Sequence, residues 1–112
     1  MSKPDPQLYT IVCILDIEPK NEFEIKMNPS ISLAQLRTKI IEERSRLLNG
    51  IKPADLTLHR VNIEGAKEIE ELRGILLGLK DKEPLRPILP LIEVYPSPPP
   101  AGTVHIAVIV PP

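Results

Sequence analysis

Two apolar runs rich in β-branched residues stand at opposite ends of the chain, and they constrain its fold more than any other feature. Residues 8–17 have the sequence LYTIVCILDI, and residues 103–110 have the sequence TVHIAVIV. Successive side chains of a strand point to opposite faces of a sheet, so a strand that is apolar on both faces must be covered on both. Both runs are therefore expected at the centre of one sheet.

A hairpin is predicted to follow the first of these strands. Residues 18–21 (EPKN) are turn-forming, and residues 22–27 then alternate between charged and apolar side chains. The apolar side chains are expected to face the core and the charged ones the solvent. This second strand therefore belongs at or near a sheet edge, where its charges discourage indiscriminate pairing.

An amphipathic helix is predicted after the hairpin. Ser32 and Gln35 have the spacing of a capping box, and Asn49-Gly50 is a typical helix stop signal. The apolar stripe between them comprises Leu33, Leu36, Ile40 and Leu47. We expect this stripe to pack on one face of the sheet.

Three further segments complete the chain. A third strand is predicted at residues 55–63, and a short helix, possibly broken because it contains Gly74 and Gly78, at residues 69–79. Residues 84–100 hold seven of the fourteen prolines, so we expect a rigid, extended connection there.

The order of these elements predicts an α+β fold of the ubiquitin-like β-grasp class. The first and last strands would pair in parallel at the centre of a mixed sheet, with one main helix packed across it by a right-handed connection. One domain of 112 residues is expected, with residues 1–7 as a flexible N-terminus.

Composition argues against several classes of function. Fourteen basic and fifteen acidic residues give a net charge of −1, so nothing draws the domain to nucleic acid, and its apolar runs are too short to span a membrane. Cys13 lies within a predicted central strand, where a thiol is inert.

No phosphate-binding loop or catalytic spacing is present, so we expect neither an enzyme nor a cofactor. His59 and His105 fall on neighbouring strands, but two histidines alone are too few for a metal site.

Two segments give the chain a family resemblance. Residues 95–100 (YPSPPP) and 104–111 (VHIAVIVP) resemble the closing segment of the N-terminal header domains of Crinkler effectors, where a proline-rich stretch precedes a His-aliphatic-x-Val-x-x-Pro signature. Residues 54–61 (ADLTLHRV) resemble the family's Leu-x-Leu strand, which in oomycete members carries the translocation motif Leu-Phe-Leu-Ala-Lys. The matching residues are Leu56, Leu58, Arg60, His105, Ile106, Val108 and Pro111.

The resemblance implies a protein-interaction and trafficking module for a C-terminal effector domain that is absent from this chain. Thr57 and His59 depart from the oomycete motif, and the first residues contain no secretory signal, so the chain is more similar to fungal members. Export by a non-classical route into a host cell, with its nucleus as one destination, is then expected. The partner would be a host protein or a second copy, giving a homodimer, and it would contact the exposed side of the third strand, formed by Thr57, His59 and Arg60.

Other interpretations of these residues remain open. Leu56 and Leu58 are also what a simple core strand requires. The run Pro98-Pro99-Pro100 could bind an SH3 or WW domain, although its place just before the last strand favours a rigid crossover. A cellular ubiquitin-like adaptor is the alternative function, and it would not be conjugated, because the chain ends in Val110-Pro111-Pro112 rather than Gly-Gly.

Overall fold

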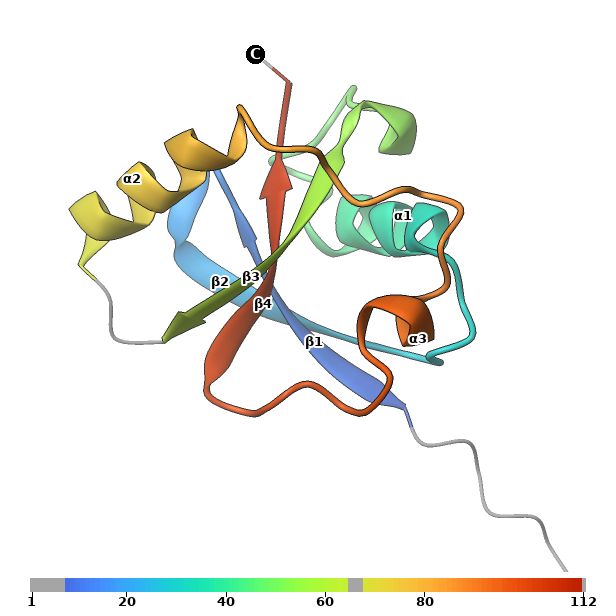
Figure 1. Cartoon of the computed structure of the whole chain (residues 1–112). Coiled ribbons are helices and arrows are strands. Elements are labelled where there is room, and N and C mark those ends of the chain that lie inside the picture. Colours follow the sequence, from blue (N-terminus) through green and yellow to red (C-terminus); the bar gives the residue numbers. More distant parts are fainter. Residues whose placement is uncertain (1–7, 65–67, 112) are drawn as a thin grey trace, which may run out of the picture.

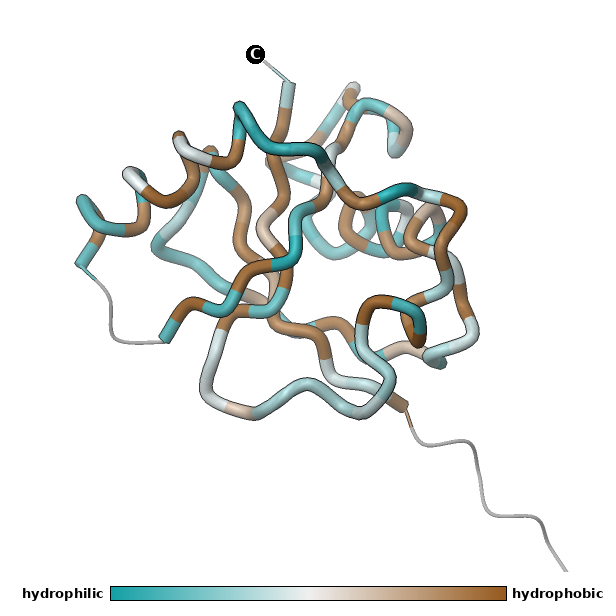
Figure 2. The backbone as a smooth tube through the Cα atoms, viewed as in Figure 1, coloured by the Kyte–Doolittle hydropathy of each residue, from teal (hydrophilic) through white to brown (hydrophobic). Residues whose placement is uncertain are grey.

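A mixed sheet forms the centre of the molecule in the computed structural model, which describes residues 8–64 and 68–111. Its two central strands, β1 (Tyr9–Leu15) and β4 (Thr103–Ile109), run parallel (Figure 1). Most of their side chains are buried, and Figure 2 shows both strands as largely hydrophobic. The expected flexible N-terminus, residues 1–7, lies outside the described residues.

The outer strands give the sheet the order β2-β1-β4-β3. β2 (Glu18–Met27) is antiparallel to β1, and β3 (Thr57–Glu64) is antiparallel to β4. β2 begins before the predicted position because Leu15 already pairs with Glu18, and the register then shifts to bring Phe23 opposite Cys13. The predicted β-grasp strand order and directions are confirmed.

The helix α1 (Leu33–Glu43) covers one face of this sheet. The hydroxyl of its N-cap residue, Ser32, accepts a hydrogen bond from the backbone N–H of Gln35 at 3.4 Å. Such a side-chain cap satisfies one of the helix N–H groups that have no partner within the helix. The predicted start of the helix is therefore confirmed.

The C-terminal part of the predicted stripe differs from the structure. The helix ends with Arg44 as its C-cap, and the chain continues through turns to Gly50, whose φ of 84° suits glycine. Leu47 is 41% exposed, whereas its neighbour Leu48 is 1% exposed and lies in the core. Helical spacing ceases to predict burial where the backbone leaves the helical path.

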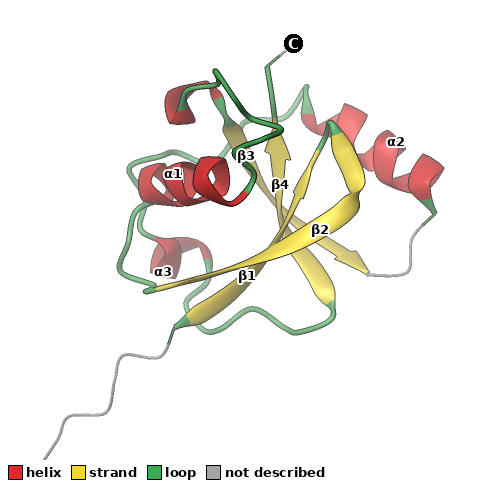
Figure 3. Cartoon of the chain, turned by 180° about the vertical axis from the view of Figure 1, so that it is seen from behind, coloured by secondary structure: helices red, strands yellow, loops and turns green. Residues whose placement is uncertain are grey.

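The opposite face of the sheet carries α2 (Ile69–Leu79) (Figures 1 and 3). Leu76 and Leu79 from this helix share a buried cluster with Ile14 and Ala107 from the two central strands. The helix is continuous through Gly74 and Gly78. Both faces of the central strands are therefore covered by helices, as their apolar sequences require.

A third helix lies inside the proline-rich region, where we expected an extended connection. α3 (Leu91–Val94) follows its N-cap, Pro90, and Leu91 is completely buried beside α1 and the sheet. The segment before it caps α1, because the N–H groups of Leu33 and Ala34 donate to the carbonyls of Leu89 and Pro87. This region therefore belongs to the packed core.

Candidate protein-interaction surface

The Leu-x-Leu residues of β3 lie in the core. Leu56 is 0% and Leu58 is 2% exposed, and both belong to the buried cluster beneath α1. Burying a leucine side chain stabilises a fold by about 1.5 to 3 kcal/mol, which accounts for both leucines without any contact to a partner. They are not available to a partner on the surface of the folded domain.

The three residues expected to form the exposed side of β3 are in different environments. Arg60 is exposed and Thr57 is partly buried. His59 is only 5% exposed, so the prediction of an exposed His59 is wrong. His59 lies opposite Ala107, which packs against α2, and this side of the sheet is covered.

Burial gives His59 a pH dependence. Desolvation lowers the pKa of its imidazole, and the positive charge of Lys82 lowers it further. The unfolded chain then binds a proton more readily than the folded one between the folded pKa and the ordinary value of 6.5. Protonation of this group therefore favours unfolding.

Acidification should destabilise the wild type more than a His59→Gln variant. The contribution of His59 to stability is fully present above pH 6.5 and is lost as the pH falls through the lowered folded pKa. Urea denaturation at a series of pH values between about 7.5 and 5 measures the difference, since other titrating groups are common to both chains. Equal slopes for the two proteins would contradict this account of His59.

The outer edge of β3 is partly blocked by other segments. The N–H of Leu85 donates to the Leu58 carbonyl at 2.7 Å, and the Arg37 guanidinium donates to the Leu56 carbonyl at 3.2 Å. These bonds occupy backbone acceptors that an added strand would need. Binding at β3 therefore has to use its side chains rather than strand addition along this part of the edge.

His105, the first residue of the closing signature, acts as a side-chain bridge within the sheet. It is 3% exposed, and its Nδ1 accepts a hydrogen bond from the Val12 backbone N–H at 3.0 Å. The Nε2 lies 2.5 Å from the Pro100 carbonyl oxygen. Because Nδ1 is an acceptor, Nε2 carries the proton and donates it to Pro100.

The place of this bridge explains why a side chain is needed. The parallel pairing of β1 with β4 begins with Cys13 opposite Ile106, one residue beyond the Val12 and His105 positions. At the end of this ladder, the imidazole accepts the hydrogen bond of the Val12 N–H. Its other nitrogen bonds to the Pro100 carbonyl, so the side chain connects β1 to the proline segment. These contacts give His105 a structural, hydrogen-bonding role.

Tyr95 connects the same bridge to Arg60. Its hydroxyl donates to the His105 carbonyl at 2.7 Å, and burial raises the pKa of this phenol to about 12. The guanidinium carbon of Arg60 lies 4.9 Å from the centre of the Tyr95 ring. An exposed cation is thereby held over an aromatic face that is itself fixed by a buried hydrogen bond.

An open pocket lies beside these residues. Its volume is about 250 Å³, and its lining includes Arg60, Tyr95, His105 and the prolines from Pro96 to Pro100. We call Arg60, Tyr95 and residues 96–100 the Arg60 surface. The sequence indicates Arg60 and the prolines separately, and it gives no signal for Tyr95 beyond its place at the start of the YPSPPP segment.

The remaining signature residues are structural or lie beyond the last strand. Ile106 and Val108 are completely buried on the α1 side, and Pro111 is exposed after β4. The carboxylate of Asp16 accepts the Val110 N–H at 2.9 Å, which fixes the end of the strand.

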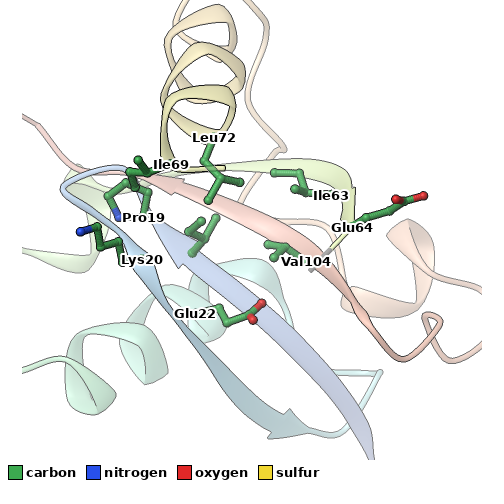
Figure 4. Close-up of a pocket in the computed structure, with 9 residues that line it drawn as sticks. Pro19, Lys20, Glu22, Ile63, Glu64, Ile69, Leu72 and Val104 are labelled. Carbon is green, nitrogen blue, oxygen red and sulfur yellow. The ribbon is translucent and has the colours of Figure 1, made fainter. Parts of the chain in front are cut away.

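A second pocket, of about 190 Å³, lies between α2 and the sheet (Figure 4). Ile63, Leu72 and Val104 line its apolar part, and Lys20 and Glu22 contribute charges of opposite sign. The lining contains no serine, threonine, cysteine or histidine, so it lacks the Ser–His and Cys–His pairs that many acyl-transfer enzymes use.

Other chemistry is equally unsupported in the described part of the chain. Burial raises the pKa of the Cys13 thiol, which makes the reactive thiolate inaccessible. Among residues 8–64 and 68–111, no three histidine, cysteine or acidic side chains gather in a way that could hold a metal ion. Within the same residues, no helix combines the length and apolarity needed to cross a membrane.

Nearly the whole described chain matches one known protein family. Residues 9–110 match the family model described as the Crinkler effector protein N-terminal domain. A search of curated proteins found no significant match.

Solved structures with the same fold include two ubiquitin-like proteins. Ubiquitin from Caldiarchaeum subterraneum aligns with a TM-score of 0.57 at 12% identity, covering 95% of this chain and 96% of that one. The C-terminal ubiquitin-like domain of mouse tubulin-specific chaperone E aligns with a TM-score of 0.55 at 17% identity, covering 99% and 94%. These alignments show that the fold is ubiquitin-like.

Proposed function

Because the chain belongs to the family of Crinkler effector N-terminal domains, we propose that it is a protein-interaction and trafficking module. It would bind partners and direct the delivery of an effector domain joined to its C-terminal side. Delivery into a host cell, by a non-classical export route and with the nucleus as one destination, completes the proposal. The family model and the ubiquitin-like fold support a binding module over other classes.

The observation that carries the proposal is the Arg60 surface. Arg60 is exposed and is positioned over Tyr95, next to an open pocket and a run of exposed prolines. Arginine and aromatic residues contribute most to the energy of protein interfaces, and a segment that is already rigid loses little entropy on binding. We therefore propose that a host protein contacts this surface through Arg60 rather than through His59.

We also propose that the domain has no catalytic activity of its own. Both ring nitrogens of His105 are occupied by backbone groups, and the Cys13 thiol is buried. These observations support a binding role, since both side chains serve the fold instead of nucleophilic or acid–base chemistry.

An Arg60→Ala variant should deliver less cargo to host cells than the wild type. The experiment joins a reporter enzyme to the C-terminus of the chain and measures reporter activity inside host cells, normalised to the amount secreted. Loss of the Arg60 contact should reduce delivery about tenfold, which corresponds to about 1.4 kcal/mol of binding energy. Arg73→Ala is the matched control, because Arg73 is exposed on α2.

The outcomes separate the proposal from its alternatives. Equal delivery by the two variants would remove the Arg60 surface from the mechanism, and a reporter delivered equally well without the domain would overturn the trafficking role. A fusion that is retained by the producing cell would favour a cellular adaptor that is not conjugated. Light scattering over a concentration series distinguishes a homodimer from a monomer that captures host protein.

A further inference from the structure

Ser97 is the only serine or threonine in the chain that is followed by proline. It stands in the segment Pro96-Ser97-Pro98, and a residue before proline is restricted to an extended conformation. Proline-directed protein kinases bind their substrates in an extended form with proline directly after the acceptor. Pro98 supplies the proline that such an enzyme requires, while the folded domain bends the chain at Pro96 and Ser97, so this segment has to straighten to enter the kinase.

The fold leaves the Ser97 hydroxyl accessible. Ser97 and both flanking prolines are exposed, and Ser97 makes no hydrogen bond to any other residue in the part of the chain that the structure describes. In Figure 1 the segment between α3 and β4 forms an outer border of the molecule, away from α1 and α2. A kinase can therefore approach this segment without unfolding the domain.

The two ends of the segment are held in place. The Tyr95 hydroxyl donates a hydrogen bond to the backbone carbonyl of His105, and the Pro100 carbonyl accepts hydrogen bonds from the His105 ring and from the Thr103 hydroxyl. Between these anchors, residues 96–98 cross the surface as an exposed stretch, followed by the half-buried Pro99. Their position is thus fixed relative to β4, which pairs with β3.

A cation shares a pocket with the acceptor residue. Arg60 and Ser97 line the same open pocket, and the Arg60 guanidinium rests on the Tyr95 ring. A phosphoserine carries a charge of about −2 and three strong acceptor oxygens, and a guanidinium binds such a group by two parallel hydrogen bonds. Arg60 is therefore placed to stabilise the modified form.

We propose that Ser97 is a phosphorylation site for a proline-directed protein kinase and that Arg60 binds the resulting phosphate. The Ser97 Oγ attacks the γ-phosphorus of ATP, the new O–P bond forms as the bond to ADP breaks, and the hydroxyl proton passes to the base of the kinase. The modification replaces a neutral hydroxyl with an anion at the Arg60 surface. It neutralises the cation there and acts as a switch on whatever this surface binds.

The test incubates the purified chain with a recombinant proline-directed kinase and Mg-ATP, and follows the intact mass and the modified peptide. One phosphoryl group on Ser97 is expected for the wild type and for Arg60→Ala, and none for Ser97→Ala. Pro98→Ala should slow the reaction by an order of magnitude or more. A folded chain that stays unmodified while a synthetic peptide of residues 93–102 is phosphorylated would overturn the site.

The role of Arg60 has a separate readout. Phosphorylation should raise the Tm of the wild type by about 3 °C, as expected for one exposed but well-placed ion pair, and should not raise that of Arg60→Ala. An equal shift in both proteins, or none in either, would overturn the pairing while leaving the acceptor assignment intact. Neither result depends on the delivery experiment, so this inference and the proposed function can fail independently.

Discussion

A His105→Leu variant is expected to unfold with about 3 kcal/mol less free energy than the wild type. Leucine fills a similar space, but the Val12 N–H loses its partner, and the Pro100 carbonyl keeps only the bond from the Thr103 hydroxyl. Each polar group left unsatisfied in a buried place costs about 1 to 3 kcal/mol. Urea denaturation followed by circular dichroism measures the change, which should appear as a lower midpoint with a nearly unchanged slope.

The matched control is His59→Leu, measured at pH 7.5. His59 is also a buried histidine in a neighbouring strand, but its ring makes no hydrogen bond to any described residue. Its replacement should therefore change the free energy of unfolding by less than about 1 kcal/mol. Equal losses in the two variants would mean that burial, and not the bridge from Val12 to Pro100, determines the importance of His105.

Replacing Leu91 by alanine should cost about 3 kcal/mol, within the usual range of about 2 to 5 for a buried leucine. Leu91 is 0% exposed, and α3, to which it belongs, has only four residues and no independent stability. The variant loses the contacts of the side chain and leaves a cavity beside α1 and the sheet. Thermal and urea denaturation both measure the loss.

The neighbouring Ile92→Ala variant tests the same helix without the core contact. Ile92 is 45% exposed, so its truncation should change stability by less than about 1 kcal/mol. Comparable losses at the two positions would show that the segment matters through its helix propensity, whereas no loss at either would contradict the packing of α3. Only a large loss of stability for Leu91→Ala together with a small one for Ile92→Ala supports the assignment of this region to the core.

The sequence predicts the sheet well because its signals are local. The doubly apolar runs, the alternation of β2 and the cap at Ser32 each occur within a few residues, and each is confirmed by the structure. The sequence does not predict α3, because four residues are too few to show a helical period and the prolines before it favour an extended chain. Only its packing against α1 and the sheet makes Leu91 a core residue.

The candidate site was harder to predict for a related reason. Alternation separates the two faces of a strand but does not say what covers each face, so His59 was assigned to solvent although its side of the sheet is covered. The signature identified His105 as notable. Its bond to Val12, however, joins residues 93 positions apart, and no local pattern contains that information.

The same separation governs when the domain can acquire its structure. The centre of the sheet pairs Cys13 with Ile106, so the first strand has no permanent neighbour on that side until almost the entire chain is available. Contacts between such distant residues must overcome the entropy of closing a long loop, and proteins dominated by them fold slowly. During synthesis, the nascent polypeptide therefore cannot complete its core until β4 has left the ribosome, and up to that moment β1 remains an exposed apolar strand that chaperones can bind.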